Sequence, residues 1–128
     1  MTINRGTSAL GYTKVGENVL LMAYCHIAHD CIVGDNVIMA NMATLGGHVE
    51  LGNWAFLGGG VLVHQFCKVG EHSLIAAGFR AVQDVPPFIW ASGEPNQYSG
   101  INNVGLNRRG ISFEERRLIK QIYLLYFR

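Results

Sequence analysis

The sequence of 128 residues has no long apolar run, few charges and few prolines. No stretch approaches the roughly 18–20 consecutive apolar residues of a membrane-spanning helix, so we expect no membrane span. Charged residues make up 15% of the chain and the formal net charge is +1, which gives no electrostatic basis for binding nucleic acid. The first residues lack a signal-peptide core, and the sequence therefore predicts a cytoplasmic protein. The low charge content also predicts that some surface is buried against other copies of the chain.

Cysteine is equally scarce. The three cysteines, Cys25, Cys31 and Cys67, are odd in number and widely spaced, which argues against a disulfide framework. Cys25 and Cys31 could form half of a metal site, but the repeat described next favours a simpler role for all three in the core.

A six-residue repeat runs from Val15 to Pro86. Stepping by six from Val15 meets only large aliphatic residues until Ala81, and the position after each is mostly Gly or Ala. The fifth position of the hexad, which includes all three cysteines, is nearly always small or β-branched. Neither a helical period nor strict alternation produces this pattern. It is typical of an all-β solenoid, the left-handed parallel β-helix, in which first and fifth positions point inward and the small second position lets the chain turn.

The chain divides into three predicted segments. Residues 1–87 form the β-helix, which we expect to end at Pro86 and Pro87 because proline cannot continue strand pairing. Residues 88–110 are predicted to be an irregular excursion. Residues 111–128 begin a helical region, in which Ser112 and Glu115 match a capping box and the helix continues to about Tyr126. One helix has little to pack on, so we expect the chain to be a fragment of a longer protein.

The repeat also brings histidines together. Three hexads make one coil of 18 residues, so residues 18 apart stack in a column on one face. His29, Gly47 and Gln65 share a column, and the neighbouring positions add further histidines at the same corner. The sequence thus predicts a patch roughly 10 Å tall. It comprises His26, His29, His48, His64 and Gln65.

Two chemistries fit such a patch. Three imidazoles can hold Zn²⁺ with an open fourth position, as in a trimeric zinc hydratase. Alternatively, one imidazole can act as general base for a hydroxyl that attacks an activated acyl group. The neighbouring Gly46 and Gly47 favour the second, because backbone N–H groups that no side chain shields suit a developing oxyanion.

Several runs of sequence closely resemble the acyl-ACP–UDP-N-acetylglucosamine O-acyltransferase family, which carries out the first step of lipid A biosynthesis. These runs are LLMAYCHIAHDC (20–31), NMATLGGHV (41–49), VHQFCKVG (63–70), QDVPPF (83–88) and GLNRRG (105–110). HIAHD and VHQF at this spacing are more specific than the hexapeptide repeat, which many acyltransferases share. The resemblance covers nearly the whole chain, whereas the family's N-terminal coils and most of its C-terminal helical domain have no counterpart here.

The resemblance implies transfer of a fatty acyl chain, often 3-hydroxyacyl, from acyl carrier protein to the 3-hydroxyl of UDP-N-acetylglucosamine. It implies a homotrimer with sites at subunit interfaces and no metal or dissociable cofactor, since phosphopantetheine arrives on the carrier protein. The implied catalytic residues are His29 as general base, Gly47 as oxyanion donor through its N–H, and Asp30, which would orient the imidazole.

The resemblance also implies residues that bind the substrates. Those near the sugar nucleotide are His26, His48, His64 and Gln65. Those near the uridine and phosphates are Asn102, Arg108 and Arg109. For the two arginines, contact with the phosphates is favoured because a guanidinium pairs well with phosphate oxygens. An acyl groove between subunits would be lined by Ala76, Ala77 and Gly78, where small residues favour a longer acyl chain.

Three alternatives stay open. A close relative acylates a 3-amino UDP-sugar and forms an amide, which assays with both acceptors would distinguish. A trimeric zinc hydratase would retain stoichiometric zinc after metal-free purification. An inactive scaffold fragment would lack transferase activity that a longer version of the chain possesses.

Overall fold

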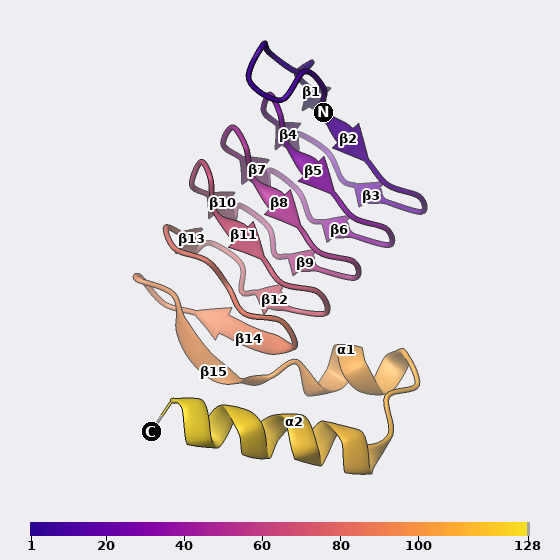
Figure 1. The fold of residues 1–128 in the computed structure, drawn as a ribbon, viewed down its shortest axis with the longest axis vertical. Helices are drawn as coiled ribbons and strands as arrows, with labels where there is room; N and C mark the ends of the chain where they lie inside the picture. Colours follow the sequence, from indigo (N-terminus) through magenta and orange to yellow (C-terminus); the bar gives the residue numbers. More distant parts are fainter. Residues whose placement is uncertain (128) are drawn as a thin grey trace.

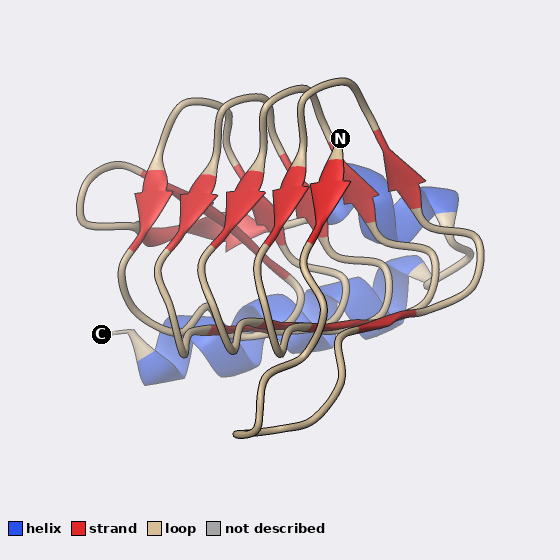
Figure 2. Cartoon of the chain, turned by 90° about the horizontal axis from the view of Figure 1, so that it is seen from above, coloured by secondary structure: helices blue, strands red, loops and turns tan. Residues whose placement is uncertain are grey.

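The computed structural model describes residues 1–127, which form a stack of coils followed by a strand pair and two helices (Figure 1). The stack is a left-handed parallel β-helix, as the hexads predict. Each complete coil contributes one short strand to each of three sheets, here called sheets A, B and C. Figure 2 shows the strands of successive coils side by side, with the helices beyond them.

Nearly all the strands are two residues long. Sheet A contains β1 (Thr2–Ile3), β4 (His26–Ile27), β7 (Thr44–Leu45), β10 (Leu62–Val63) and β13 (Arg80–Ala81). Sheet B contains β2 (Lys14–Val15), β5 (Ile32–Val33), β8 (Glu50–Leu51) and β11 (Lys68–Val69). Sheet C contains β3 (Leu20–Leu21), β6 (Ile38–Met39), β9 (Phe56–Leu57), β12 (Leu74–Ile75), β14 (Ile89–Ser92) and β15 (Gln97–Ile101). From β2 to β13 the strands pair in parallel at the predicted spacing of one coil, as Ile32 does with Glu50.

The first and fifth hexad positions fill the interior of the stack, as the sequence predicts. Leu45 and Leu57 are fully buried first-position residues, and the fifth-position cysteines are buried with free thiols. The Cys31 thiol donates a hydrogen bond to the Gly46 carbonyl over 3.1 Å, so even its weak donor is satisfied inside the core. The cysteines are therefore core residues.

The corners turn at the fourth hexad position, which corrects the expectation that the small second position makes the turn. Non-glycine residues at the fourth position, from Asn18 to His72, have φ between 54° and 67°, in the left-handed region. The second position is small for another reason, because the backbone of the next coil packs on it. A Cβ atom added to Gly58 would lie 2.5 Å from the backbone nitrogen of Ala77.

Sheet A includes a strand, β1, that precedes the first hexad of the repeat. β1 pairs with β4, and Thr2 lies opposite His26, a separation of 24 residues instead of 18. Residues 4–13, here called the N-terminal loop, accommodate the six extra residues and project from the stack (Figure 1). The insertion moves β1 out of the hexad register, and the repeat therefore does not reveal it.

The segment 88–110 is not irregular, and strand pairing does not end at Pro86 and Pro87. β14 extends sheet C beyond β12, with Leu74 opposite Trp90, and β15 returns antiparallel to β14. The two prolines occupy a corner, where no ladder hydrogen bond from their nitrogens is needed. The segment also contains helix α1 (Asn103–Arg108).

Helix α2 (Phe113–Tyr126) follows, and its start is confirmed because the Ser112 side chain accepts a hydrogen bond from the Glu115 N–H. Figure 1 shows α2 crossing the end of the stack beyond β15. The Tyr123 hydroxyl donates to the Pro87 carbonyl over 2.6 Å and anchors the helix there. Leu118, Ile122 and Leu125 of this helix are exposed. Arg128, the last residue of the predicted helical region, lies outside the described residues.

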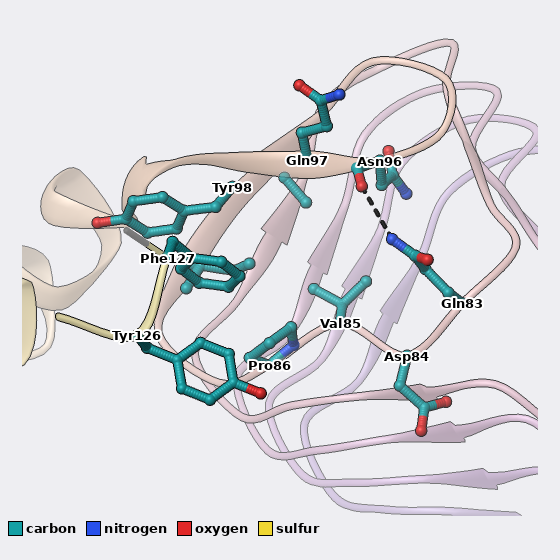
Figure 3. Close-up of a pocket in the computed structure, with 11 residues that line it drawn as sticks. Gln83, Asp84, Val85, Pro86, Asn96, Gln97, Tyr98, Tyr126 and Phe127 are labelled. Carbon is teal, nitrogen blue, oxygen red and sulfur yellow. Dashed lines mark hydrogen bonds between the residues drawn. The ribbon is translucent and has the colours of Figure 1, made fainter. Parts of the chain in front are cut away.

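An open pocket of about 400 Å³ lies at the junction between α2 and the stack. Figure 3 shows Tyr126 and Phe127 approaching Val85 and Pro86 from the helix end, while the Gln83 amide donates to the Asn96 carbonyl. Among residues 1–127, no helix has both the length and the apolar character to span a bilayer.

The inward and outward positions of one sheet give a direct test of the fold. Leu45 is fully buried, whereas Leu62, on the adjacent strand, is 42% exposed. We expect Leu45→Ala to lower the free energy of unfolding by about 2–5 kcal/mol, because it removes packed methyl groups and leaves a cavity. The matched control Leu62→Ala should cost less than about 1 kcal/mol. Denaturant unfolding measures both, and equal losses would contradict the assignment of inward positions.

Candidate functional site

The centre of the candidate site is the pair His29 and Asp30, at the corner between sheets A and B. His29 Nδ1 lies 2.8 Å from Asp30 Oδ2. An ionised carboxylate accepts hydrogen bonds and cannot donate them, so the neutral imidazole carries its proton on Nδ1. Nε2 is then the basic nitrogen. The His29 side chain is 42% exposed, which leaves it accessible to a substrate.

Asp30 is buried, although it occupies the fourth position of its hexad. Its carboxylate accepts hydrogen bonds from the N–H and the hydroxyl of Thr7, in the N-terminal loop. Burial alone would raise the pKa of Asp30, but the hydrogen bonds from Thr7 and His29 outweigh it and hold the pKa well below its usual range. Asp30 is therefore a stable anion, as its predicted role in orienting the imidazole requires.

Gly47 lies directly against the His29 ring, one coil along the stack. A Cβ atom added to Gly47 would lie 2.7 Å from both Cε1 and Nε2 of His29, which is closer than packed atoms approach. Within residues 1–127 the Gly47 N–H donates to no acceptor, while its carbonyl accepts from the Phe66 N–H. The basic nitrogen of His29 and an unused N–H donor are therefore adjacent, as the column of residues 18 apart predicts.

The other predicted sugar-nucleotide residues surround this pair. His48 Nε2 lies 3.7 Å from Asp30 Oδ2, and the His48 ring stacks on Phe66 with centroids 4.6 Å apart. His26 Nδ1 lies 2.5 Å from the Thr2 hydroxyl, so β1 holds this ring in place. His64 and Gln65 are exposed two coils along the stack from His29. Their contacts with a substrate stay predictions.

A metal ion has one candidate place among the described residues, and it overlaps this pair. His29, Asp30 and His48 each offer a ligand atom within 4.8 Å of the others. The set is two imidazoles and a carboxylate, not the three imidazoles of the predicted zinc alternative. The Asp30 carboxylate is already occupied by donors from Thr7 and His29, so the geometry favours the general-base arrangement.

A second cluster occupies the corner between sheets B and C. Arg109 lies over the Trp54 ring, 5.1 Å from its centroid, and one of its guanidinium nitrogens is 3.2 Å from His72 Nδ1. Burial and the Arg109 charge lower the pKa of His72, so the ring is neutral and can accept this hydrogen bond. The Asn102 side chain caps α1 at Gly105 and donates to the His72 carbonyl.

This cluster borders a hollow of about 620 Å³, over the outer face of sheet C. Trp54, Trp90 and Arg108 are among its lining residues, and Arg108 is exposed. Asn102 is only 1% exposed, so the structure gives it a positioning role, while its direct contact with a uridine stays a prediction. Sequence reasoning missed His72 here, because its contact with Arg109 joins residues 37 positions apart outside the repeat.

The predicted site residues do not all meet within one chain. His29 lies at the corner between sheets A and B, whereas Arg108 and Arg109 border the corner between sheets B and C. Ala76, Ala77 and Gly78 lie at the third corner, between β12 and β13. Their role in an acyl groove stays a prediction. The side chains of His29 and the two arginines therefore lie at different corners of one chain.

Comparison with known proteins identifies relatives over the whole chain. Residues 84–128 match the family described as UDP N-acetylglucosamine O-acyltransferase, domain 2, and residues 12–47 match the bacterial transferase hexapeptide repeat. The acyl-[acyl-carrier-protein]–UDP-N-acetylglucosamine O-acyltransferase of Thiobacillus denitrificans is 49% identical over 99% of this chain and 50% of its own length. That of a Janthinobacterium species is 50% identical over all of this chain and 49% of its own.

Solved structures agree with this relationship. The UDP-N-acetylglucosamine O-acyltransferase of Moraxella catarrhalis is 39% identical with a TM-score of 0.94, over 98% of this chain and 49% of that one. The Campylobacter jejuni UDP-N-acetylglucosamine acyltransferase is 44% identical with a TM-score of 0.89, over 92% and 47% of the two chains. The resemblance to this family, predicted from HIAHD and VHQF, is thus confirmed, and the chain spans about half the length of the curated relatives it matches.

The contact between Gly47 and His29 gives a test of the site's geometry. We expect Gly47→Ala to displace the His29 ring and weaken its hydrogen bond to Asp30, because the new Cβ would lie 2.7 Å from the ring. Overpacking of this kind costs about 1–3 kcal/mol. NMR of the imidazole nitrogens should show shifted His29 signals. In the matched control Gly59→Ala, where the nearest atom is 3.5 Å away, they should stay in place. Unchanged His29 signals in both variants would contradict the described packing.

Proposed function

We propose that this relative of the UDP-N-acetylglucosamine O-acyltransferases transfers a fatty acyl chain from acyl carrier protein to the 3-hydroxyl of UDP-N-acetylglucosamine. This is the first step of lipid A biosynthesis, and the acyl chain is of the 3-hydroxyacyl type. One observation carries the proposal: a histidine, oriented by a buried carboxylate, presents its basic nitrogen beside a backbone N–H that has no partner among residues 1–127.

In the proposed reaction, His29 Nε2 takes the proton from the sugar 3-hydroxyl as its oxygen attacks the thioester carbonyl carbon. The Gly47 N–H donates to the oxygen that becomes negative in the tetrahedral intermediate. Collapse of the intermediate breaks the carbon–sulfur bond, and the imidazolium returns its proton to the departing thiolate of phosphopantetheine. The products are the 3-O-acylated sugar nucleotide and the free carrier-protein thiol, and no metal or dissociable cofactor takes part.

Asp30 supports both states of His29 in this cycle. It accepts from Nδ1 while the ring is neutral, and its negative charge stabilises the imidazolium that forms. General-base catalysis of this kind contributes about 10²–10⁴-fold to a rate, and an oxyanion donor about 10²–10³-fold.

The proposal includes a homotrimer with shared sites. His26, His48, His64 and Gln65 of one copy would contact the sugar nucleotide, and Arg108 and Arg109 of its neighbour would bind the phosphates. Two observations support this arrangement. The arginines and His29 lie at different corners of one chain, and the low charge content suits surface that is buried on assembly. A cytoplasmic location stays part of the proposal.

An alternative acceptor is a sugar nucleotide that carries an amino group in place of the 3-hydroxyl. A 3-amino sugar nucleotide would use the same base and the same N–H donor, and would yield an amide. Transfer assays with both acceptors separate these two activities, and we expect the 3-hydroxyl sugar to be the better substrate. Absence of transfer to either acceptor would favour the inactive scaffold.

The direct test is transfer from acyl-ACP to UDP-N-acetylglucosamine by the wild type and by His29→Gln. Glutamine cannot accept the hydroxyl proton, so we expect kcat to fall by at least about 10²-fold. The control Gln121→Ala, on the exposed surface of α2, should retain wild-type kcat. A wild-type rate in a folded His29→Gln protein would contradict the mechanism.

A further inference from the structure

The N-terminal loop covers one corner residue that the repeat alone would leave in solvent. Among other fourth-position residues, Tyr24, Met42 and Phe66 are 79%, 61% and 64% exposed and His48 is half-buried, whereas Asp30 is 2% exposed. All five have φ in the left-handed region, so the backbone does not account for the difference. The loop does, because its residues contact Asp30 directly.

The contacts are specific hydrogen bonds. The Thr7 N–H donates to Asp30 Oδ1 over 2.8 Å, and the Thr7 hydroxyl donates to Oδ2 over 2.5 Å. The Asp30 N–H in turn donates to the Thr13 hydroxyl over 2.9 Å, which fixes the backbone from the same loop. Oδ2 is also the oxygen that accepts from His29 Nδ1, and His48 Nε2 lies 3.7 Å from it.

We propose that Thr7 is a positioning residue for His29 and acts through Asp30. The inference rests on the proposed function, in which His29 is the general base. The two donors of Thr7 hold both carboxylate oxygens independently of His29, whereas without the hydroxyl the remaining hydrogen bond to Oδ2 among residues 1–127 would come from His29 itself. A fixed Oδ2 keeps the His29 proton on Nδ1, and this keeps Nε2 basic and beside Gly47.

The hydroxyl can be removed with little change of shape. Thr7→Val keeps the side-chain volume and the N–H bond to Oδ1 but loses the donor to Oδ2, together with the acceptor for the Ala9 N–H. Thr7→Ser keeps both the donor to Oδ2 and the acceptor for the Ala9 N–H. Ser8→Ala removes a neighbouring exposed hydroxyl that has no hydrogen-bond partner among residues 1–127. Thermal unfolding of all three variants establishes that each is folded before activity is compared.

We expect kcat of Thr7→Val to fall by about tenfold to a hundredfold, the range found when outer partners that orient metal-binding histidines are removed. KM for UDP-N-acetylglucosamine should stay within about twofold, because in the proposal Thr7 acts on Asp30 and not on the sugar nucleotide. Thr7→Ser should restore most of kcat, and Ser8→Ala should match the wild type. A general loss of structure would not produce this separation of kcat from KM together with rescue by serine.

A second measurement does not depend on activity. Nitrogen-15 NMR shows which ring nitrogen of neutral His29 carries the proton. The wild type and Thr7→Ser should show it on Nδ1, and Thr7→Val should show a mixture of both tautomers. An unchanged tautomer or an unchanged kcat in folded Thr7→Val would overturn the proposal. If the wild type transfers no acyl chain, the proposed function fails, while the tautomers still decide whether Thr7 orients His29.

Discussion

The structure depends on one constraint, the backbone hydrogen bonds that join each coil to the next at a spacing of 18 residues. In sheet C, for example, the Ile38 N–H donates to the Ala55 carbonyl over 3.0 Å, and the same pairing recurs around the stack. With this register fixed, every side chain has a defined neighbour one coil away. The apolar core, the small residues beneath each following coil, and the contact of Gly47 with His29 are consequences of that spacing.

The same register explains why chemistry gathers at a corner. Strand residues point either into the core or straight out from a flat sheet, whereas corner residues can approach one another closely. At the corner between sheets A and B, the column of His29 and Gly47 places a base against an N–H donor. The adjacent column places His48 between the Asp30 carboxylate and the Phe66 ring. The N-terminal loop then buries Asp30 and supplies the donors that hold it.

Much of this was predictable from the sequence, because the hexads report directly on burial. The buried first and fifth positions, the core role of the cysteines and the column of His29, Gly47 and Gln65 all follow from the period. The family followed from HIAHD and VHQF, whose residues carry the chemistry rather than the fold.

The six-residue period does not predict the elements that lie outside the repeat or out of its register. β1 was missed because six inserted residues put it out of register, and with it the loop that carries Thr7. The repeat does not predict β14 and β15, because Pro86 and Pro87 suggest an end to strand pairing and Pro95 with several Gly and Asn residues suggests irregular chain, although prolines at a corner interrupt no ladder. The contact of His72 with Arg109 joins the stack to a segment outside the repeat, and spacing cannot show it.

The central claim is that one copy of the chain supplies His29 and a neighbouring copy supplies the arginines. Mixing His29→Ala chains with Arg108→Ala chains, after unfolding and joint refolding, tests it most directly. Each variant alone should be nearly inactive. An equal mixture should recover about a quarter of wild-type transfer activity, because one interface in four then pairs an intact His29 with an intact Arg108. A mixture no more active than its two components would contradict a shared site.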